Sequence, residues 1–294
     1  MTHTLPPGQR LRDAWRDGPV QIPGVFCPLV ARLAEQLGFR AVYLSGAALS
    51  ASLGLPDVGL ITQTEFADEA ARIVRATTLP LLCDADTGFG EALNVERTVR
   101  LYESAGAAGL HLEDQILPKR CGHLSGKGLV TTETMVQKIR AAVAARRDPS
   151  FLLVARTDAR GVDGMDAALE RGRRYLDAGA DALFPEAMQG PDEFAHFARE
   201  IHRDRPDVPL LANMTEFGKS PLLDVATLGG LGYRMVLYPV SLLRSALLAA
   251  QRTLEAIRDD GHQRDRVADM LTRQDLYNLL GYNDYETRDR NFFS

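Results

Sequence analysis

The feature that most constrains the fold of this chain is a glycine that recurs between a helical segment and the next apolar run. It occurs in EQLGFRAVYL, ESAGAAGLHL and LDAGADALFP. Glycine suits the left-handed conformation that ends many helices, so each segment predicts a helix that stops just before a strand. A strand that follows a helix in this way is typical of a parallel sheet with crossover helices.

Short apolar runs of this kind recur about eight times, and segments with helical spacing separate them. They lie at residues 24–28, 40–46, 79–86, 107–114, 151–158, 180–187, 208–215 and 234–241. Eight such units favour an α/β fold of the (β/α)8 TIM-barrel type. An open doubly wound sheet is the alternative.

The pattern becomes purely helical after Ser241. We expect residues 241–258 to complete the barrel and residues 265–281 to present apolar side chains to another subunit. The polar tail from Asn283 to Ser294 is expected to be less ordered. The whole chain, residues 1–294, is therefore predicted to form a single (β/α)8 barrel domain, with residues 241–294 as a C-terminal helical extension.

Composition excludes several classes of function. The 294 residues are 45% hydrophobic and 25% charged, which indicates a globular protein with a substantial core. A net charge of -5 gives no basic field for nucleic acid. We see neither a secretory leader nor an apolar run of roughly 20 residues, and therefore expect a cytoplasmic protein without a membrane partner. Cys27, Cys83 and Cys121 lack metal-site spacing and are expected to be free thiols.

Polar side chains follow the apolar runs at the ends of consecutive predicted strands. In a (β/α)8 barrel the carboxyl ends of the strands form the active-site face. One such residue is more often a cap or a turn, but a set of them predicts a site. The set comprises Ser45, Asp84, Asp86, Glu113, Arg156, Asp158, Glu186, Asn213 and Thr215.

Asp84 and Asp86 are candidate metal ligands. They are separated by one residue, so in a strand their side chains point to the same face. Together with Glu113 they offer the hard oxygen ligands that suit Mg²⁺ or Mn²⁺. The alternative is a salt-bridged or capping pair.

The motif KRCGH, from Lys119 to His123, places three potential cations around the thiol of Cys121. Such a setting allows a thiol to donate or accept a proton near neutral pH. Arg156 and Arg244 could each hold a carboxylate through two parallel hydrogen bonds, which predicts a polyanionic small-molecule substrate.

Four longer segments resemble one known superfamily. They are YLSGAALSASLGLPDVGLIT, LLCDADTGFGEALNVERTV, AAGLHLEDQILPKRCGHLSGK and ANMTEFGKSPL. From about residue 10 to about residue 285, the chain resembles the isocitrate lyase and phosphoenolpyruvate mutase superfamily. The combination of KRCGH with DAD and HLEDQ is highly specific. The resemblance implies a carbon-carbon lyase on a (β/α)8 barrel that splits 2-methylisocitrate into succinate and pyruvate.

The resemblance also implies a role for individual residues. Asp84 and Asp86 would hold Mg²⁺, directly or through water, and Glu113 would support the hydrated ion. The substrate site would comprise Ser45, Gly46, Ala47, Cys121, Gly122, Arg156, Glu186, Asn213, Thr215, Arg244 and Arg273. The superfamily usually has glycine where Ala47 stands. A homotetramer is implied as well, in which a terminal helix is exchanged between neighbouring barrels.

The implied reaction is a retro-aldol, or reverse Claisen, cleavage. Tyr43 would take the proton of the substrate hydroxyl, and the cation would stabilise the developing negative charge. Cys121 would then protonate the succinate-side carbanion. Arg156 and His123 would hold the succinyl carboxylates, while residues 117–130 close over the site.

Alternative functions stay open at this stage. Isocitrate differs from 2-methylisocitrate by one methyl group, which pockets discriminate weakly. Other 2-hydroxy and 2-oxo acid lyases, decarboxylases and phosphonate mutases of the superfamily generally lack the full KRCGH. A remote alternative is a carboxylate-binding barrel without catalysis, which predicts no activity that removal of Mg²⁺ or of the Cys121 thiol could abolish. For His111 we expect a structural or supporting role.

Overall fold

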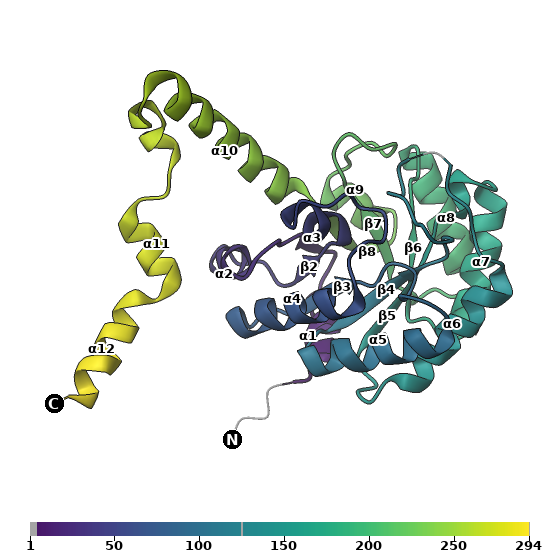
Figure 1. Cartoon of the computed structure of the whole chain (residues 1–294). Coiled ribbons are helices and arrows are strands. Elements are labelled where there is room, and N and C mark those ends of the chain that lie inside the picture. Colours follow the sequence, from purple (N-terminus) through teal and green to yellow (C-terminus); the bar gives the residue numbers. More distant parts are fainter. Residues whose placement is uncertain (1–4, 125, 294) are drawn as a thin grey trace.

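A computed structural model describes residues 5–124 and 126–293 of the chain. Eight parallel strands form one sheet in the order β1-β8-β7-β6-β5-β4-β3-β2 (Figure 1). A parallel bridge between Gly24 and Tyr43 joins the two edges, so the barrel is nearly closed. The strands are β1 Val20–Pro23, β2 Val42–Leu44, β3 Leu81–Asp84, β4 Gly109–Glu113, β5 Leu152–Thr157, β6 Ala182–Pro185, β7 Leu210–Asn213 and β8 Tyr233–Tyr238. The prediction of a TIM-type barrel is confirmed.

Helices lie on the outside of the strands and continue beyond the last strand. They are α1 Pro7–Ala14, α2 Pro28–Gln36, α3 Gly46–Ser52, α4 Gln63–Ala76, α5 Ala92–Ala105, α6 Thr132–Ala145, α7 Met165–Asp177, α8 Pro191–Asp204, α9 Val225–Gly230, α10 Ser241–Asp260, α11 Arg273–Leu280 and α12 Tyr282–Phe292. Two short 3-10 turns, Ala159–Gly161 and Arg264–Asp269, interrupt this series. Gly106, with a φ of 87°, ends α5 in the left-handed conformation, as the recurring glycine predicted.

The apolar core has two main layers. Inside the barrel, side chains such as Val20, Ile22 and Leu82 pack against one another, and Leu11 of α1 joins them. A larger cluster fills the space between the strands and the surrounding helices. The strands are therefore buried on both faces, which explains why they appear in the sequence as continuous apolar runs.

The prediction of a first strand at residues 24–28 is wrong. β1 ends at Pro23, and Gly24 joins the sheet only through its bridge to Tyr43. Pro28 begins α2, and Cys27 is the extended residue before it. Since proline has a fixed φ and no N–H, it suits the first turn of a helix, and GVFCP is the connection from strand to helix.

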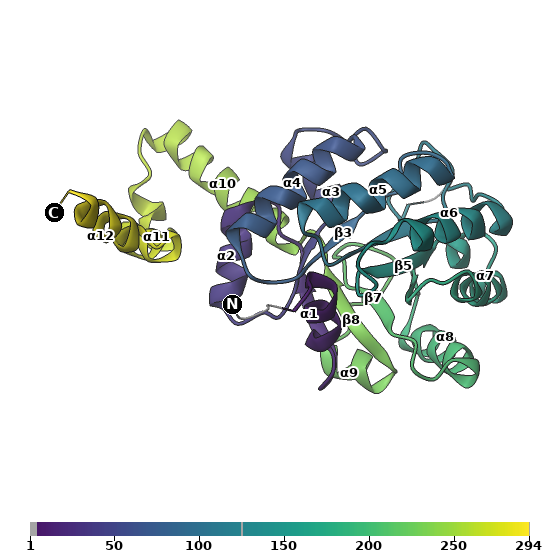
Figure 2. The same cartoon turned by 90° about the horizontal axis from the view of Figure 1, so that it is seen from below.

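The C-terminal segment forms an arm, which we define as residues 241–293. α10, α11 and α12 project from the barrel, and α11 contacts α2 (Figures 1 and 2). Within α10 only Leu243 is buried, so residues 241–258 do not complete the barrel of their own chain, contrary to expectation. The predicted less ordered tail is also wrong as far as Phe292, because it forms α12; Ser294 lies outside the described residues.

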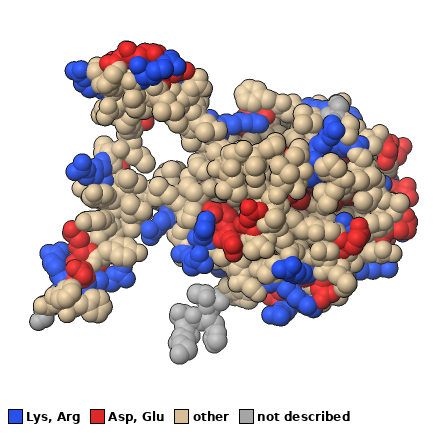
Figure 3. All heavy atoms as spheres, in the orientation of Figure 1, with Lys and Arg blue, Asp and Glu red and all other residues tan. Residues whose placement is uncertain are grey.

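The arm exposes large apolar side chains to solvent in the single chain. In Figure 3 charged side chains gather at the top of the arm, where α10 ends, and near the C-terminal end of the arm, while the surface between them is mostly uncharged. The exposed set includes Leu247, Leu248, Leu254, Ile257, Val267, Met270, Leu271, Tyr285, Phe292 and Phe293. Among the described helices, none is long and apolar enough to cross a membrane.

Candidate active site

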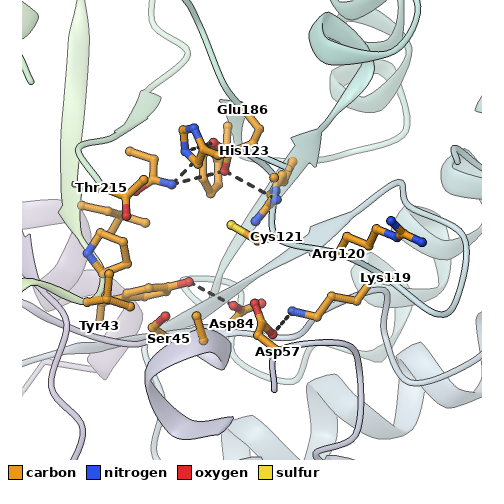
Figure 4. Close-up of a pocket in the computed structure, with 18 of the residues that line it drawn as sticks. Tyr43, Ser45, Asp57, Asp84, Lys119, Arg120, Cys121, His123, Glu186 and Thr215 are labelled. Carbon is orange, nitrogen blue, oxygen red and sulfur yellow. Dashed lines mark hydrogen bonds and ion pairs between the residues drawn. The ribbon is translucent and has the colours of Figure 1, made fainter. Parts of the chain in front are cut away.

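A cavity of about 90 Å³ opens at the carboxyl ends of the strands. Figure 4 shows Cys121 lying between Asp84 on one side and the pair His123 and Glu186 on the other. The lining residues are Tyr43, Ser45, Ala47, Asp57, Asp84, Lys119, Arg120, Cys121, Gly122, His123, Arg156, Phe184, Glu186, Asn213, Thr215, Leu237, Pro239, Val240 and Arg244. The acidic strand ends and the thiol thus share one cavity.

Asp84 is held in place from three directions. Its Oδ2 accepts a hydrogen bond from the Gly46 backbone N–H at 3.0 Å, and its Oδ1 accepts one from the Asp86 N–H at 2.9 Å. Oδ2 also accepts from the Tyr43 hydroxyl at 3.2 Å. A Cβ on Gly46 would lie 2.9 Å from Asp84 Oδ2, so the close approach of this backbone requires glycine.

Asp86 lies just beyond β3, after Ala85, in a turn with a positive φ of 44°. Burial, and then repulsion from Asp84, raise the pKa of Asp86 to about 7. Burial acts in the same direction on Asp84, but attraction to His111, Lys119 and Arg156 outweighs it and lowers the pKa of Asp84 to about 2. The two neighbouring carboxyl groups therefore differ in their affinity for a proton.

Lys119 brings a positive charge to this acidic end of the cavity. Its Nζ lies 2.7 Å from Asp86 Oδ1 and also contacts Asp57. Burial lowers the pKa of Lys119, but the surrounding carboxylates, Asp86 first, outweigh this and raise it. The ammonium group is therefore charged and directly beside the candidate metal ligands.

Arg156 is the centre of a second group of carboxylates. Its Nε donates to Asp158 Oδ2 at 3.0 Å, Nη1 lies 3.2 Å from Glu113 Oε2, and Nη2 lies 3.5 Å from Glu186 Oε2. The guanidinium also lies over the ring of Phe184, 5.2 Å from its centroid. Arg156 is thus fixed by packing and by ion pairs, with its position on the cavity wall set.

The pKa values of Glu113 and Glu186, which both lie beside Arg156, shift in opposite directions. Burial raises the pKa of Glu113 well above its usual range, even though Arg156 opposes this. Burial also acts to raise the pKa of Glu186, but the charge of Arg156 and then the neighbouring His123 outweigh it, and the value falls to about 2. Glu186 is therefore ionised, and it pairs with His123 Nε2 at 3.0 Å.

Tyr43 and His111 form a buried pair next to Asp84. The Tyr43 hydroxyl lies 2.7 Å from His111 Nε2. Burial, followed by the charge of Asp84, raises the pKa of Tyr43 well above its usual range, and burial lowers the pKa of His111 to about 4. Both side chains are therefore neutral at physiological pH, and the proposed role of Tyr43 as a base stays a prediction.

The KRCGH motif lies in the β4–α6 loop, residues 114–131. A bridge between Gln115 and Leu129 joins the two stems of this loop, and the Ile116 N–H donates to the Gly128 carbonyl at 2.9 Å. On the other side of the cavity, His123 Nδ1 accepts a hydrogen bond from the Lys219 N–H at 2.9 Å. The loop therefore reaches across the cavity from paired stems and brings Cys121 with it.

At Gly122 the backbone of the loop lies close against side chains of the barrel. A Cβ there would lie 2.4 Å from Glu186 Cγ and 2.5 Å from Arg156 Nη2. We expect Gly122→Ala to displace the loop and to reduce kcat/KM by roughly 100-fold, since displacements of about 1 Å have effects of that size. Steady-state turnover and thermal unfolding measure this. Gly230→Ala is the control, because a Cβ there meets nothing within 4 Å.

A divalent cation fits the donor set of this site. No three His, Cys, Asp or Glu side chains in residues 5–124 and 126–293 lie together so that they could hold a metal by themselves. Mg²⁺, however, commonly takes only one or two carboxylates and keeps several waters. Glu113 Oε1 is buried without a hydrogen-bond partner in the described structure, and such an acceptor suits a hydrated cation.

Comparison with known proteins agrees with this geometry. Residues 11–258 match the family model described as phosphoenolpyruvate phosphomutase. The chain belongs to the phosphoenolpyruvate phosphomutase family. It is 51% identical over 284 residues to a 2-methylisocitrate lyase of Aeropyrum pernix, covering 96% of this chain and 90% of the relative. A 2-methylisocitrate lyase of Bacillus subtilis is 50% identical, with 92% of this chain and 88% of the relative covered.

A solved structure of another enzyme in this comparison contains a metal. It is a phosphonopyruvate hydrolase in complex with oxalate and Mg²⁺, 32% identical, with a TM-score of 0.87 over 99% of this chain and 100% of the other. The phosphoenolpyruvate phosphomutase fold of our chain thus extends over nearly all of that structure. That complex therefore contains a dicarboxylate and a divalent cation.

In this member of the phosphoenolpyruvate phosphomutase family, most of the residues predicted from sequence lie together. Those that line the cavity are Tyr43, Ser45, Ala47, Asp84, Cys121, Gly122, His123, Arg156, Glu186, Asn213, Thr215 and Arg244. Gly46, Asp86 and Glu113 lie just behind the lining and contact Asp84, Lys119 and Arg156, respectively. Arg273 is not brought to the cavity, because it is the first residue of α11 in the arm.

Several lining residues were missed by the sequence analysis. Lys119 carried a signal, because it stands in KRCGH, but we assigned it no site role. Asp57 lies in a loop between α3 and α4 and becomes visible only through its ion pair with Lys119. Phe184, Leu237, Pro239 and Val240 are apolar, and no sequence signal separates them from core residues.

Proposed function

We propose that this chain is a Mg²⁺-dependent 2-methylisocitrate lyase that produces succinate and pyruvate. The observation that carries this proposal is the shared cavity, which Asp84, the thiol of Cys121 and Arg156 all line. Relatives that bear this name are about half identical to the chain over most of its length.

Asp84 and Asp86 would hold the cation, and Glu113 would accept a hydrogen bond from one of its waters. Bound there, Mg²⁺, or Mn²⁺ in its place, supplies a Lewis acid that stabilises negative charge on the substrate oxygens. Lys119 lies beside the same carboxylates and adds a second positive charge at this end of the cavity. This end of the cavity would thus stabilise the negative charge that develops on the substrate oxygens.

The cleavage step moves one proton away from oxygen and another one onto carbon. The substrate hydroxyl loses its proton, its carbon becomes the carbonyl carbon of pyruvate, and the electrons of the broken carbon-carbon bond remain on the succinyl carbon. Cys121 Sγ delivers its proton to that carbon, which completes succinate. Tyr43 is our candidate base: when its hydroxyl turns from Asp84 Oδ2 to His111 Nε2, 2.7 Å away, His111 can receive the phenolic proton as Tyr43 accepts another.

The remaining lining residues would bind the substrate carboxylates. Arg156 and His123 would hold the succinyl end, and Arg244 would hold a carboxylate at the mouth of the cavity. Backbone N–H groups near Ser45 would contact the pyruvyl end at short range. The other proposed contacts are Gly46, Ala47, Gly122, Glu186, Asn213 and Thr215.

A turnover assay tests the proposed function. Purified protein is supplied with 2-methylisocitrate or isocitrate, with Mg²⁺ or with EDTA, and pyruvate or glyoxylate is measured. We expect rapid release of pyruvate that EDTA abolishes and added Mg²⁺ restores. Equal kcat/KM for the two substrates, or turnover that EDTA does not affect, would contradict the proposal. The absence of turnover with either substrate would favour a barrel that only binds carboxylates.

We also propose that the working form is a cytoplasmic homotetramer in which each arm covers a neighbouring barrel. The exposed apolar side chains of the arm support this, since many large apolar side chains exposed on one segment mark an interface. Exchange of an element between identical chains is a low-cost route to such an assembly. The apolar side chains of residues 241–294 would then be covered by a neighbouring barrel, and each barrel with its extension would be a complete structural unit only within the assembly.

Arg273 supplies a test of this exchange. We expect it to reach the cavity of a neighbouring chain, because α11 lies away from the cavity of its own (Figure 1). Two inactive variants, Cys121→Ser and Arg273→Gln, should then restore part of the activity when they are co-assembled. A mixed site can combine Cys121 of one chain with Arg273 of the other. Mixed tetramers as inactive as the separate variants would contradict the exchange.

A further inference from the structure

Among the described residues of the β4–α6 loop, three basic side chains each end on a buried carboxylate of the barrel. Lys119 pairs with Asp86, His123 pairs with Glu186, and Lys127 pairs with Asp158. Lys119 and His123 line the cavity, whereas Lys127 does not. The third contact therefore lies outside the set of groups that can touch substrate.

Lys127 connects two parts of the loop to the barrel at once. Its Nζ donates to Asp158 Oδ1 at 2.6 Å and also donates to the carbonyl of Gly122. The Lys127 side chain is 2% exposed and that of Asp158 is 0% exposed. Because Gly122 directly follows Cys121, the ammonium group of Lys127 sets the backbone beside the thiol.

Asp158 also belongs to the network that holds Arg156. Its two oxygens accept from Arg156 Nε at 3.0 Å and from Arg156 Nη2 at 3.2 Å. The Asp158 N–H in turn donates to Asp114 Oδ1 at 2.9 Å. One buried carboxylate thus fixes both Arg156 on the cavity wall and the end of the loop that covers the cavity.

We propose that Lys127 is a positioning residue that holds Cys121 over the cavity through the Gly122 carbonyl and Asp158. The physical reason is that a buried ammonium and its carboxylate cannot separate without both being hydrated. Their ion pair therefore favours the loop in its position over the cavity relative to a displaced loop. Only the importance of Cys121 for turnover rests on the proposed lyase function. The position of its thiol does not.

The test measures how fast iodoacetamide alkylates each cysteine, with peptide mass spectrometry to identify the site. We expect Lys127→Met to increase the rate at Cys121 roughly tenfold, as loss of a buried ion pair releases the loop. Cys83 is 0% exposed and should stay unmodified. Arg160→Gln is the matched control: it removes the adjacent Arg160–Glu193 ion pair, which does not involve the loop, and should leave the Cys121 rate unchanged.

A double-mutant cycle identifies the partner. In an Asp158→Asn background, adding Lys127→Met should change the Cys121 rate by less than about twofold, because the ion pair is already lost.

Kinetics should show a lower kcat for Lys127→Met with Mg²⁺ affinity retained, if the lyase proposal holds. An unchanged Cys121 rate, an equal increase in both backgrounds, or labelling of Cys83 as well, which would indicate a general folding role, would each overturn the proposal. Alkylation needs no substrate, so failure of the lyase assay alone leaves this test valid.

Discussion

Replacement of Cys121 by serine is expected to reduce kcat by roughly 1000-fold, within the range that a general acid contributes. A serine hydroxyl keeps the shape of the side chain but holds its proton far more tightly than a thiol, so the succinyl carbanion is left without an effective acid. Substrate binding should persist, because Arg156 and the acidic turn are unchanged. Steady-state kinetics together with calorimetric titration of the substrate measure the two effects separately.

The matched control is Cys27→Ser. Cys27 precedes α2 and does not line the cavity, so this variant should retain full turnover. If Cys121→Ser kept wild-type kcat, the thiol would have no part in the chemistry and another proton donor would have to be sought. If both variants lost activity, a general effect of cysteine loss would be indicated instead.

The second large effect is expected from Asp86→Asn. An amide keeps one oxygen but removes the negative charge that a Mg²⁺ ion with few protein ligands requires, so apparent Mg²⁺ affinity should fall by roughly 100-fold or more. At Mg²⁺ concentrations that saturate the wild type, kcat/KM should fall by a similar factor. The stabilisation of the fold by added Mg²⁺, seen as an increase in Tm, should be lost as well.

Calorimetric titration with MgCl₂ provides a measurement that does not depend on turnover. Glu91→Gln is the control, because Glu91 is an exposed acid just beyond the same turn and should leave Mg²⁺ affinity unchanged. Equal loss in both variants would indicate a diffuse electrostatic effect. Unchanged affinity in Asp86→Asn would remove Asp86 from the proposed metal site.

Most of the fold could be predicted because its local signals agree with one another. Glycine after a helix, as at Gly106, and continuous apolar runs buried on both faces both indicate the same alternation. The first strand was misplaced because Val25 and Phe26 are apolar, whereas a proline two residues later directs the chain into α2. The course of α10 could not be predicted, because an apolar helix face does not reveal which chain it covers.

In the candidate site, too, some residues could be predicted from the sequence and others could not. Asp84, Arg156 and Glu186 could be located because they follow strands, and the barrel brings all strand ends to one face. Asp57 follows no strand, and its partner Lys119 is distant in the sequence. Asp158 was located at a strand end, but its partner Lys127 was not, because no spacing rule connects the two. The shifts in pKa of Asp86 and Glu113 arise from burial, which a sequence does not display.

The paired stems of the β4–α6 loop have a consequence for how substrate would enter the cavity and how products would leave it. Because Gln115 and Leu129 are bridged at the base, the segment beyond them can swing only as one flap, without unravelling from either side. If the loop covers bound substrate in the proposed reaction, substrate entry and product release each require this flap to lift, and the rate of lifting would then set an upper bound on kcat.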